Sequence, residues 1–264
     1  MLVWRVLHWY GQWHSEGDIL AVPNRRTLAE AIQCLSVRWT DVTKLASTDS
    51  PVFVLAAGWR SGSTLLQGIL MPQCFIWGEP YGHSCMLQDL AEPLRCITED
   101  WPEPHFFFSP ENRDAVSDRF VANLYPSVAK LLDSHRAFLE TMFKYPVPGC
   151  DPVNANARWG FKEVRLSADY AHYLKLLYPN SKILFLIRSP YDAYRSWAAR
   201  RNAGWKWFYR WPDQPVTARL FGRLWCELAG SFVEQAESLG AHSFGTKRCR
   251  RASTSRSSRF WAFR

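Results

Sequence analysis

The sequence predicts an α/β fold, a three-layer sandwich in which helices flank a central parallel sheet. Residues 51–57 read PVFVLAA and residues 182–187 read KILFLI, and both are continuous apolar runs typical of strands buried on two faces. Each run is followed by a turn and then by apolar residues at helical spacing. Strands that alternate with helices indicate a parallel sheet with right-handed crossovers, and 264 residues suit one large domain of this kind.

The remaining elements follow in order along the chain. Thr27–Leu35 is predicted to be a short helix, because Thr27 and Glu30 have the spacing of a capping box. Strands are predicted at Pro51–Ala57, Cys74–Trp77, Trp159–Val164 and Lys182–Ile187. Helices are predicted at Ser63–Met71, Arg113–Asn123, Pro126–Lys144, Ala168–Leu177, Pro190–Arg200 and Thr217–Leu239. The Pro-containing stretches 101–110 and 146–156 are predicted to be loops.

The net charge of +8 is concentrated at the C-terminus. Residues 247–264 contain seven Lys and Arg residues and no acid, which leaves +1 for the rest of the chain. A basic, Ser-rich tail of this kind is predicted to be disordered, and a near-neutral body does not indicate nucleic-acid binding. We therefore divide the chain into an N-terminal helical extension (1–50), a main domain (51–240) and a basic tail (241–264).

Cysteine usage and hydropathy predict a cytoplasmic protein without metal. The seven cysteines form no CxxC pair, which argues against a disulfide framework and against a zinc site. No run of 18 uncharged apolar residues exists, so no membrane span is predicted. Arg5 and His8 interrupt the apolar N-terminus and no small-residue cleavage site follows, so no signal peptide is predicted.

The segment Gly58–Leu66, GWRSGSTLL, has the composition of an anion-binding loop. A strand that leads through a Gly-containing turn into a helix presents backbone N–H groups and the positive end of the helix dipole. Arg60 adds a full positive charge, and the hydroxyls of Ser61, Ser63 and Thr64 add donors around Gly62. The alternative is a tight strand–helix turn whose polar residues only cap the helix.

The loop is not a nucleoside-triphosphate P-loop. That pattern is GxxxxGK[ST], whereas the spacing here is one residue shorter and the Lys is missing. A kinase would therefore lack its main phosphate-binding cation, which disfavours that activity.

Gly-x-Arg-Ser-Gly-Ser-Thr-Leu-Leu resembles the 5′-phosphosulfate loop of the sulfotransferase family, in the form seen in bacterial, carbohydrate and tyrosylprotein sulfotransferases. Members of that family bind the 3′-phosphate of the donor with an Arg that ends a strand and a Ser eight residues later. Arg188 and Ser196 in KILFLIRSPYDAYRSW match this second motif. The resemblance extends over roughly residues 51–240 and implies a P-loop-like fold.

The resemblance implies that the donor is 3′-phosphoadenosine 5′-phosphosulfate and that the reaction transfers its sulfuryl group to a hydroxyl or amine. It implies donor binding by Arg60, Ser61, Gly62, Ser63, Thr64, Arg188 and Ser196. Arg60 would also stabilise charge on the leaving phosphate, which makes it catalytic. The acceptor stays open among small molecules, sugars and peptides.

A base for the acceptor hydroxyl is expected after the second strand. Glu79 in WGEPYGH is the first candidate, because a Glu in a similar place is the proposed base in some family members, and His83 is the second. Lys162 is interpreted either as a site residue or as an edge-strand Lys that faces solvent. Asp169 is expected to cap a helix. The aromatic residues Trp197, Trp205, Trp207, Phe208, Tyr209 and Trp211 form either a core patch or a ligand surface.

The C-terminus departs from the family pattern. After residue 239 we expect another strand, more helix and a late loop over the 3′-phosphate, but AHSFGTKRCRRASTSRSSRFWAFR shows no strand–helix pattern. This predicts a domain that is incomplete at its C-terminus. Two functional readings therefore remain, an active sulfotransferase and a truncated relic that binds the donor without turnover.

Overall fold

The computed structural model of the chain describes residues 26–39, 42, 47–81, 85–108, 124–144, 158–202, 210–211, 214–215 and 217–245, with side chains undescribed at 201–216. In order, its elements are α2 (Leu28–Arg38), β1 (Val52–Ala56), α3 (Ser63–Leu70), β2 (Cys74–Trp77), α4 (Met86–Ala91), η3 (Glu92–Cys96), η4 (Pro104–Phe106), α6 (Val128–Phe143), β3 (Arg158–Glu163), α7 (Ala168–Leu177), β4 (Lys182–Ile187), α8 (Pro190–Asn202), β5 (Arg210–Trp211), β6 (Gln214–Pro215), α9 (Ala218–Gln235) and β7 (His242–Gly245).

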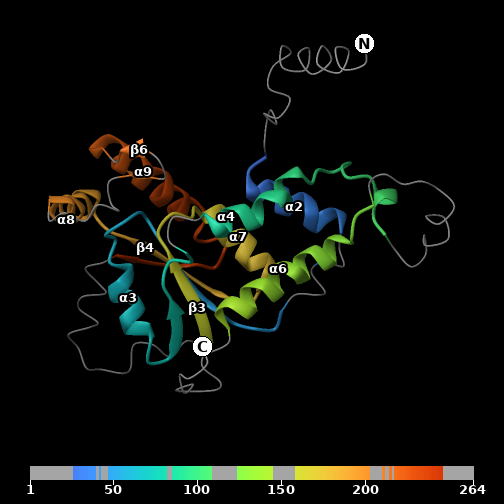
Figure 1. The fold of residues 1–264 in the computed structure, drawn as a ribbon, viewed down its shortest axis with the longest axis horizontal. Helices are drawn as coiled ribbons and strands as arrows, with labels where there is room; N and C mark the ends of the chain where they lie inside the picture. The colour runs from blue at the N-terminus through green and yellow to red at the C-terminus, as the bar shows by residue number, and fades with distance from the viewer. Residues whose placement is uncertain are drawn as a thin grey trace, which may run out of the picture.

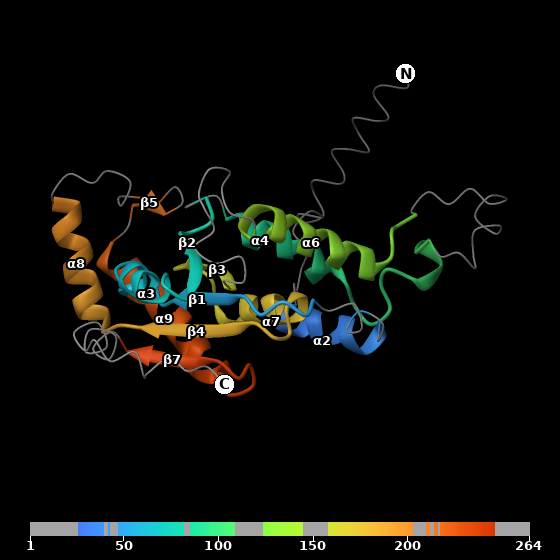
Figure 2. The ribbon, with the colours of Figure 1, turned by 90° about the horizontal axis from the view of Figure 1, so that it is seen from below.

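One parallel sheet organises the described residues. Its strand order is β2-β3-β1-β4-β7, and each neighbouring pair is parallel. The strands lie side by side, and the C-terminal end of β4 leads into α8 (Figures 1 and 2). The predicted α/β class with a parallel sheet between helices is confirmed, and so are the four predicted strands.

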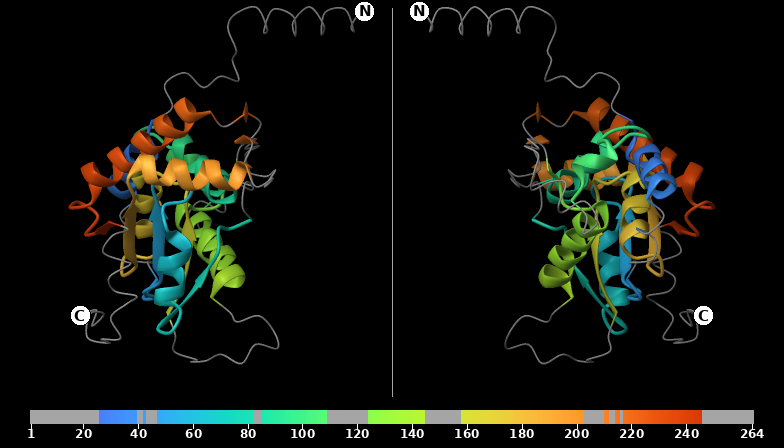
Figure 3. Two further views of the ribbon diagram at one scale, coloured as in Figure 1. Left: turned by 90° about the vertical axis from the view of Figure 1, so that its left-hand side faces the viewer. Right: turned by 90° about the vertical axis from the view of Figure 1, so that its right-hand side faces the viewer.

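The two faces of β1 belong to two separate hydrophobic clusters. Phe53 and Leu55 pack into the larger cluster with residues of α2, α6 and α7, whereas Val54 and Ala56 pack into the smaller one with residues of α3 and α8. Side chains alternate across a strand, so β1 is covered on both faces. Figure 3 shows the strands enclosed between helices. This burial on two faces explains the continuous apolar run 51–57.

The helices begin close to the predicted positions. Thr27 forms the expected capping box with Glu30 before α2. Thr217 caps α9 by accepting from the backbone N–H of Leu220. Asp169 is not a cap, because Ser167 is the N-cap of α7 and Asp169 instead accepts a hydrogen bond of 3.3 Å from Gln235. The helix expected at 113–123 and the loop expected at 146–156 both lie outside the described residues.

The C-terminal segment contains a strand that the sequence analysis did not predict. β7 pairs with β4 in parallel, with Phe244 opposite Leu186. It has four residues and three of them are exposed, so it lacks both the apolar run and the alternation that identify strands. The strand forms because these residues pair with β4, which is distant in the sequence. The expectation that no strand follows residue 239 was therefore wrong.

Candidate functional site

The loop between β1 and α3 has the backbone of an anion-binding turn. Gly58, Arg60 and Gly62 all have positive φ, at 77°, 60° and 97°. Glycine adopts this region readily, but a residue with a Cβ is strained there, and such strain is concentrated at functional sites. The carbonyl oxygen of Arg60 accepts a hydrogen bond of 2.8 Å from the guanidinium of Arg188, which holds this residue in place.

The N-terminus of α3 is open to a ligand. Its N-cap is Gly62, so no side chain caps the helix. Within the described part of the chain, the backbone N–H groups of Ser63 and Thr64 donate to no acceptor. Free N–H groups at a helix N-terminus, together with the helix dipole, favour an anion. The hydroxyl side chains of this loop differ in exposure, because Ser61 and Ser63 are buried whereas Thr64 is exposed.

Arg60, Arg188 and Ser196 converge on one place. The Nε of Arg60 donates to the hydroxyl oxygen of Ser196 at 3.1 Å, while Arg188 bonds to the backbone of Arg60. The loop after β1 and the middle of α8 are therefore joined, although 136 residues separate Arg60 from Ser196. The two motifs that the sequence placed in different segments form one site.

This site carries concentrated positive charge. Burial lowers the pKa of Arg60, and the nearby Arg200 and Arg188 lower it further. Among the described residues, neither Arg60 nor Arg188 forms an ion pair with a carboxylate. Guanidinium groups stay charged in proteins, so Arg60 and Arg188 keep positive charges that no carboxylate of the described residues compensates. An anionic ligand of the phosphate type fits this distribution of charge.

Trp225 supports the site from α9. Its indole N–H donates to the carbonyl oxygen of Arg188 at 2.9 Å. The bond fixes the backbone where β4 ends, and so fixes the start of the Arg188 side chain. This contact of Trp225 is not predictable from the sequence, because a single Trp in a helix carries no signal of such a role.

Glu79 follows β2 at the same edge of the sheet as the loop after β1, because both strands are parallel to β3. Its carboxylate forms ion pairs with the Nζ of Lys162 at 2.8 Å and with Arg165 at 3.1 Å. Lys162 is only 7% exposed and lies on a strand between two others, so the interpretation as an edge-strand Lys facing solvent was wrong.

Glu163 and Arg165 are buried and form a charge network with the half-buried Glu79. Arg165 contacts Glu163 at 2.9 Å and Glu79 at 3.1 Å, so one guanidinium joins the two carboxylates. Burial raises the pKa of Glu163 to about 7, against the opposing effect of Arg165. Glu163 and Arg165 were not among the site residues predicted from the sequence. The signal was the run of charges in KEVR at the end of a predicted strand.

The other candidate residues have separate outcomes. Trp197 is 1% exposed and packs in the core beside α3, which confirms the core interpretation for this residue. His83 and the aromatic residues at 205, 207, 208 and 209 lie outside the described residues, and the side chain of Trp211 is not described. In the described part of the chain, no cluster of three or more His, Cys, Asp or Glu is suited to a metal ion.

The fold and the site together define an α/β protein with a cluster of arginine side chains at the carboxyl edge of its parallel sheet. The family model described as "Sulfotransferase family" matches residues 51–242. The match spans well over half of the chain, so the chain belongs to the sulfotransferase family. A search of curated proteins found no match. None of the described helices has the length and apolar character needed to cross a membrane.

Proposed function

We propose that this chain transfers a sulfuryl group from 3′-phosphoadenosine 5′-phosphosulfate to a hydroxyl or amine of an acceptor. The observation that carries the proposal is the convergence of Arg60, Arg188 and Ser196 at the carboxyl ends of β1 and β4. Membership of the sulfotransferase family supports the reaction type. The paired anion-binding features support a donor with phosphate groups at both 3′ and 5′ positions.

The donor residues divide between the two ends of the nucleotide. The N–H groups of Ser63 and Thr64 and the charge of Arg60 hold the 5′-phosphosulfate, with Ser61, Gly62 and the Thr64 hydroxyl in the same loop. Arg188 and Ser196 hold the 3′-phosphate, for which a planar guanidinium offers two parallel donors. Arg60 then stabilises the charge that develops on the leaving 5′-phosphate, without donating its proton.

Glu79 is the proposed base. The bound donor supplies a sulfuryl group whose bond to the 5′-phosphate breaks as the acceptor oxygen bonds to sulfur. Glu79 receives the proton that the acceptor hydroxyl loses, and the released nucleotide is 3′-phosphoadenosine 5′-phosphate. A carboxylate has about four lone-pair positions, so its ion pairs with Lys162 and Arg165 leave room for a hydroxyl. We place the reaction in the cytoplasm, because the seven cysteines are odd in number and form no CxxC pair, which is typical of reduced thiols.

Binding of 3′-phosphoadenosine 5′-phosphate, measured by thermal shift against adenosine 5′-phosphate and ATP, tests the donor assignment. We expect a saturable rise in Tm with the first nucleotide and a much smaller one with the other two. Equal shifts with ATP would point to a kinase-like site instead. Single-turnover transfer from donor labelled in its sulfuryl group then separates the active enzyme from a chain that binds donor without turnover.

A further inference from the structure

One buried guanidinium joins two carboxylates at the carboxyl end of β3. The Nη1 atom of Arg165 contacts Glu79 at 3.1 Å, and its Nη2 atom contacts the two oxygens of Glu163 at 2.9 and 3.0 Å. The Arg165 side chain is 1% exposed, whereas that of Glu79 is 27% exposed. The accessible end of this row of contacts is therefore the carboxylate of Glu79, the proposed base.

The backbone of β3 anchors the buried end of the row. Glu163 is the last residue of β3, and one of its carboxylate oxygens accepts a hydrogen bond of 2.7 Å from the N–H of Val164. A planar guanidinium presents its N–H groups in a rigid fork, so Nη1 has one direction once Nη2 is held by Glu163. Arg165 therefore orients the Glu79 carboxylate from a fixed point on the sheet.

Stability alone does not account for the pair of Glu163 and Arg165. Both residues are buried. The cost of removing two charges from water largely offsets their attraction, and apolar side chains of similar size are often as stabilising. Burial also raises the pKa of Glu163 to about 7, which shows that its ionised form is held at a cost. What the pair provides is a fixed charge beside Glu79.

The charges around Glu79 determine how readily its carboxylate accepts a proton. Lys162 contacts one carboxylate oxygen at 2.8 Å, and Arg165 contacts the other at 3.1 Å. Two cations beside one carboxylate stabilise its anionic form and oppose transfer of a proton to it. An ionised Glu163 offsets the charge of Arg165, so Glu79 is then the better base.

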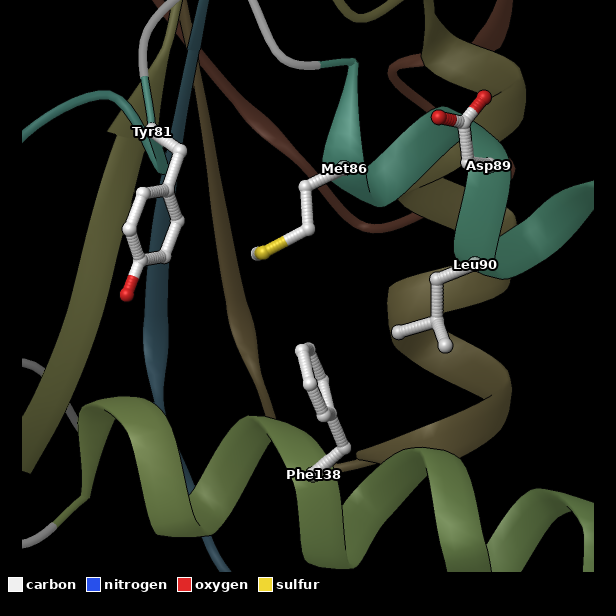
Figure 4. Close-up of a pocket in the computed structure, with 5 residues that line it drawn as sticks. All are labelled: Tyr81, Met86, Asp89, Leu90 and Phe138. Atoms are coloured by element: carbon white, nitrogen blue, oxygen red, sulfur yellow. The ribbon is translucent and has the colours of Figure 1, made fainter.

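The charged groups that act on Glu163 belong to the same network. Among the described residues they are Arg165, on its own segment, and Glu79, in the turn after β2, while the neighbouring strand β1 is apolar. The pocket of about 390 Å³ beside that turn adds none. Figure 4 shows the Asp89 carboxylate pointing away from the space between its other lining residues, which are Tyr81, Met86, Leu90 and Phe138.

We propose that Arg165 is a positioning residue of the transfer reaction, which fixes the Glu79 carboxylate, and that the negative charge of Glu163 keeps Glu79 able to take the proton of the acceptor. The inference rests on the proposed function, because Glu79 is the base of that reaction. Protonation of Glu163 has the opposite effect, since the whole charge of Arg165 then acts on Glu79 and slows proton removal.

Carbon-13 NMR of the full chain, labelled at the glutamate carboxyl carbons, tests the link between the two carboxylates. Loss of a signal in Glu79→Gln assigns the carboxyl signal of Glu79. We expect this signal to shift near pH 7, where Glu163 ionises, and the shift to be absent in Glu163→Gln. Asp133→Asn is the matched control, because it also removes a carboxylate paired with a buried arginine, Arg136, and should leave the shift in place.

Hydrolysis of the donor, in which water is the acceptor and sulfate is released, tests the effect on the reaction. Glu163→Gln mimics the protonated form of Glu163. Its kcat should be about three- to tenfold below wild type above about pH 8, a small part of what a positioned base contributes, and equal to wild type below about pH 6. The dissociation constant of 3′-phosphoadenosine 5′-phosphate should not change, and Asp133→Asn should follow wild type at every pH.

Arg165→Lys separates geometry from charge. Lysine keeps the positive charge but has a single nitrogen, so it cannot hold both carboxylates in the geometry of a fork. We expect a lower kcat at every pH and no shift of the Glu79 signal near pH 7. A Glu79 signal that does not shift near pH 7 in wild type, or a kcat ratio of wild type to Glu163→Gln that is constant with pH, overturns the proposal.

The result is separable from the outcome of the donor experiment. If the nucleotide binds and Glu79→Gln abolishes hydrolysis, but Glu163→Gln behaves as wild type at every pH, the positioning inference fails and the sulfuryl-transfer proposal stands. If the two carboxylates are linked in the NMR experiment but the nucleotide does not bind, the network is real but does not serve a sulfotransferase, and both proposals fail as stated.

Discussion

The guanidinium of Arg188 donates a hydrogen bond of 2.8 Å to the backbone carbonyl oxygen of Arg60. The residue that ends β4 therefore holds the loop that follows β1 at its most strained position, where Arg60 has a φ of 60°. One arginine stabilises the conformation of the other, and both lack a carboxylate partner among the described residues. This relationship couples the two halves of the proposed donor site.

Backbone strain at Arg60 gives a prediction about stability. Arg60→Gly should be more stable than Arg60→Ala by about 1 kcal/mol, because only glycine adopts the left-handed region without a Cβ penalty. Both variants lose the cation and should bind 3′-phosphoadenosine 5′-phosphate at least about tenfold more weakly, a loss in the range of a charged hydrogen bond. Urea denaturation measures the first effect and calorimetry the second. Equal stability of the two variants would argue against strain at this residue.

Trp225 should affect donor binding through Arg188. Trp225→Phe removes the hydrogen bond to the Arg188 carbonyl and should destabilise the chain by about 1 kcal/mol. Trp77→Phe is the matched control, because its indole N–H also donates to a carbonyl oxygen, that of Phe143, at 2.7 Å. Both variants should lower Tm, but only Trp225→Phe should weaken nucleotide binding. If both variants weakened nucleotide binding equally, the role of Trp225 would be structural only.

Gly160 permits the close approach of β3 to β1. A Cβ at this position would lie 1.7 Å from the carbonyl oxygen of Val52, which is backbone and has no room to move away. Gly160→Ala should therefore destabilise the sheet by several kcal/mol, on the order of the largest single-residue effects. Gly222→Ala, in α9 with no atom within 4 Å of the added Cβ, should instead stabilise the chain by about 0.5–1 kcal/mol. Chemical denaturation of both variants measures this contrast, and similar effects would contradict the β1–β3 register.

Glu163 should make stability depend on pH. Burial raises its pKa to about 7 in the folded chain, above the usual value of 4.5, so the folded chain retains a proton that the unfolded chain has released. The folded state is then favoured at low pH, and this contribution is lost as the pH rises from about 5 to 8. Glu163→Gln should gain on the order of 1–3 kcal/mol relative to wild type over that range. A stability difference that stays constant between pH 5 and pH 8 would show that Glu163 titrates normally.

Local patterns were sufficient to predict the strands and helices that build the donor site. Residues 51–57 and 182–187 were recognisable because strands covered on both faces have continuous apolar sequences. The convergence of Arg60 and Ser196 was predictable only through the resemblance to a family. Arg60 and Ser196 are 136 residues apart in the sequence, and no local pattern indicates that their side chains form a hydrogen bond.

The features that were missed depend on strand order, which is not a local property. Lys162 looked like an edge-strand residue because charged side chains are common on edges, but β3 lies between β2 and β1. Its charge is compensated by Glu79 from another strand end. β7 was not predicted for a related reason. Its four residues are largely exposed, and they form a strand only because they pair with the edge of β4.

Isothermal titration of 3′-phosphoadenosine 5′-phosphate and adenosine 5′-phosphate tests the central claim most directly, with wild type and Arg188→Ala compared. We predict that wild type binds the first nucleotide at least about tenfold more tightly, since one charged contact contributes roughly 1.5–3 kcal/mol, and that Arg188→Ala removes most of this difference. Equal binding of both nucleotides by wild type, or a preference that persists in Arg188→Ala, would contradict the assignment of the 3′-phosphate to this site.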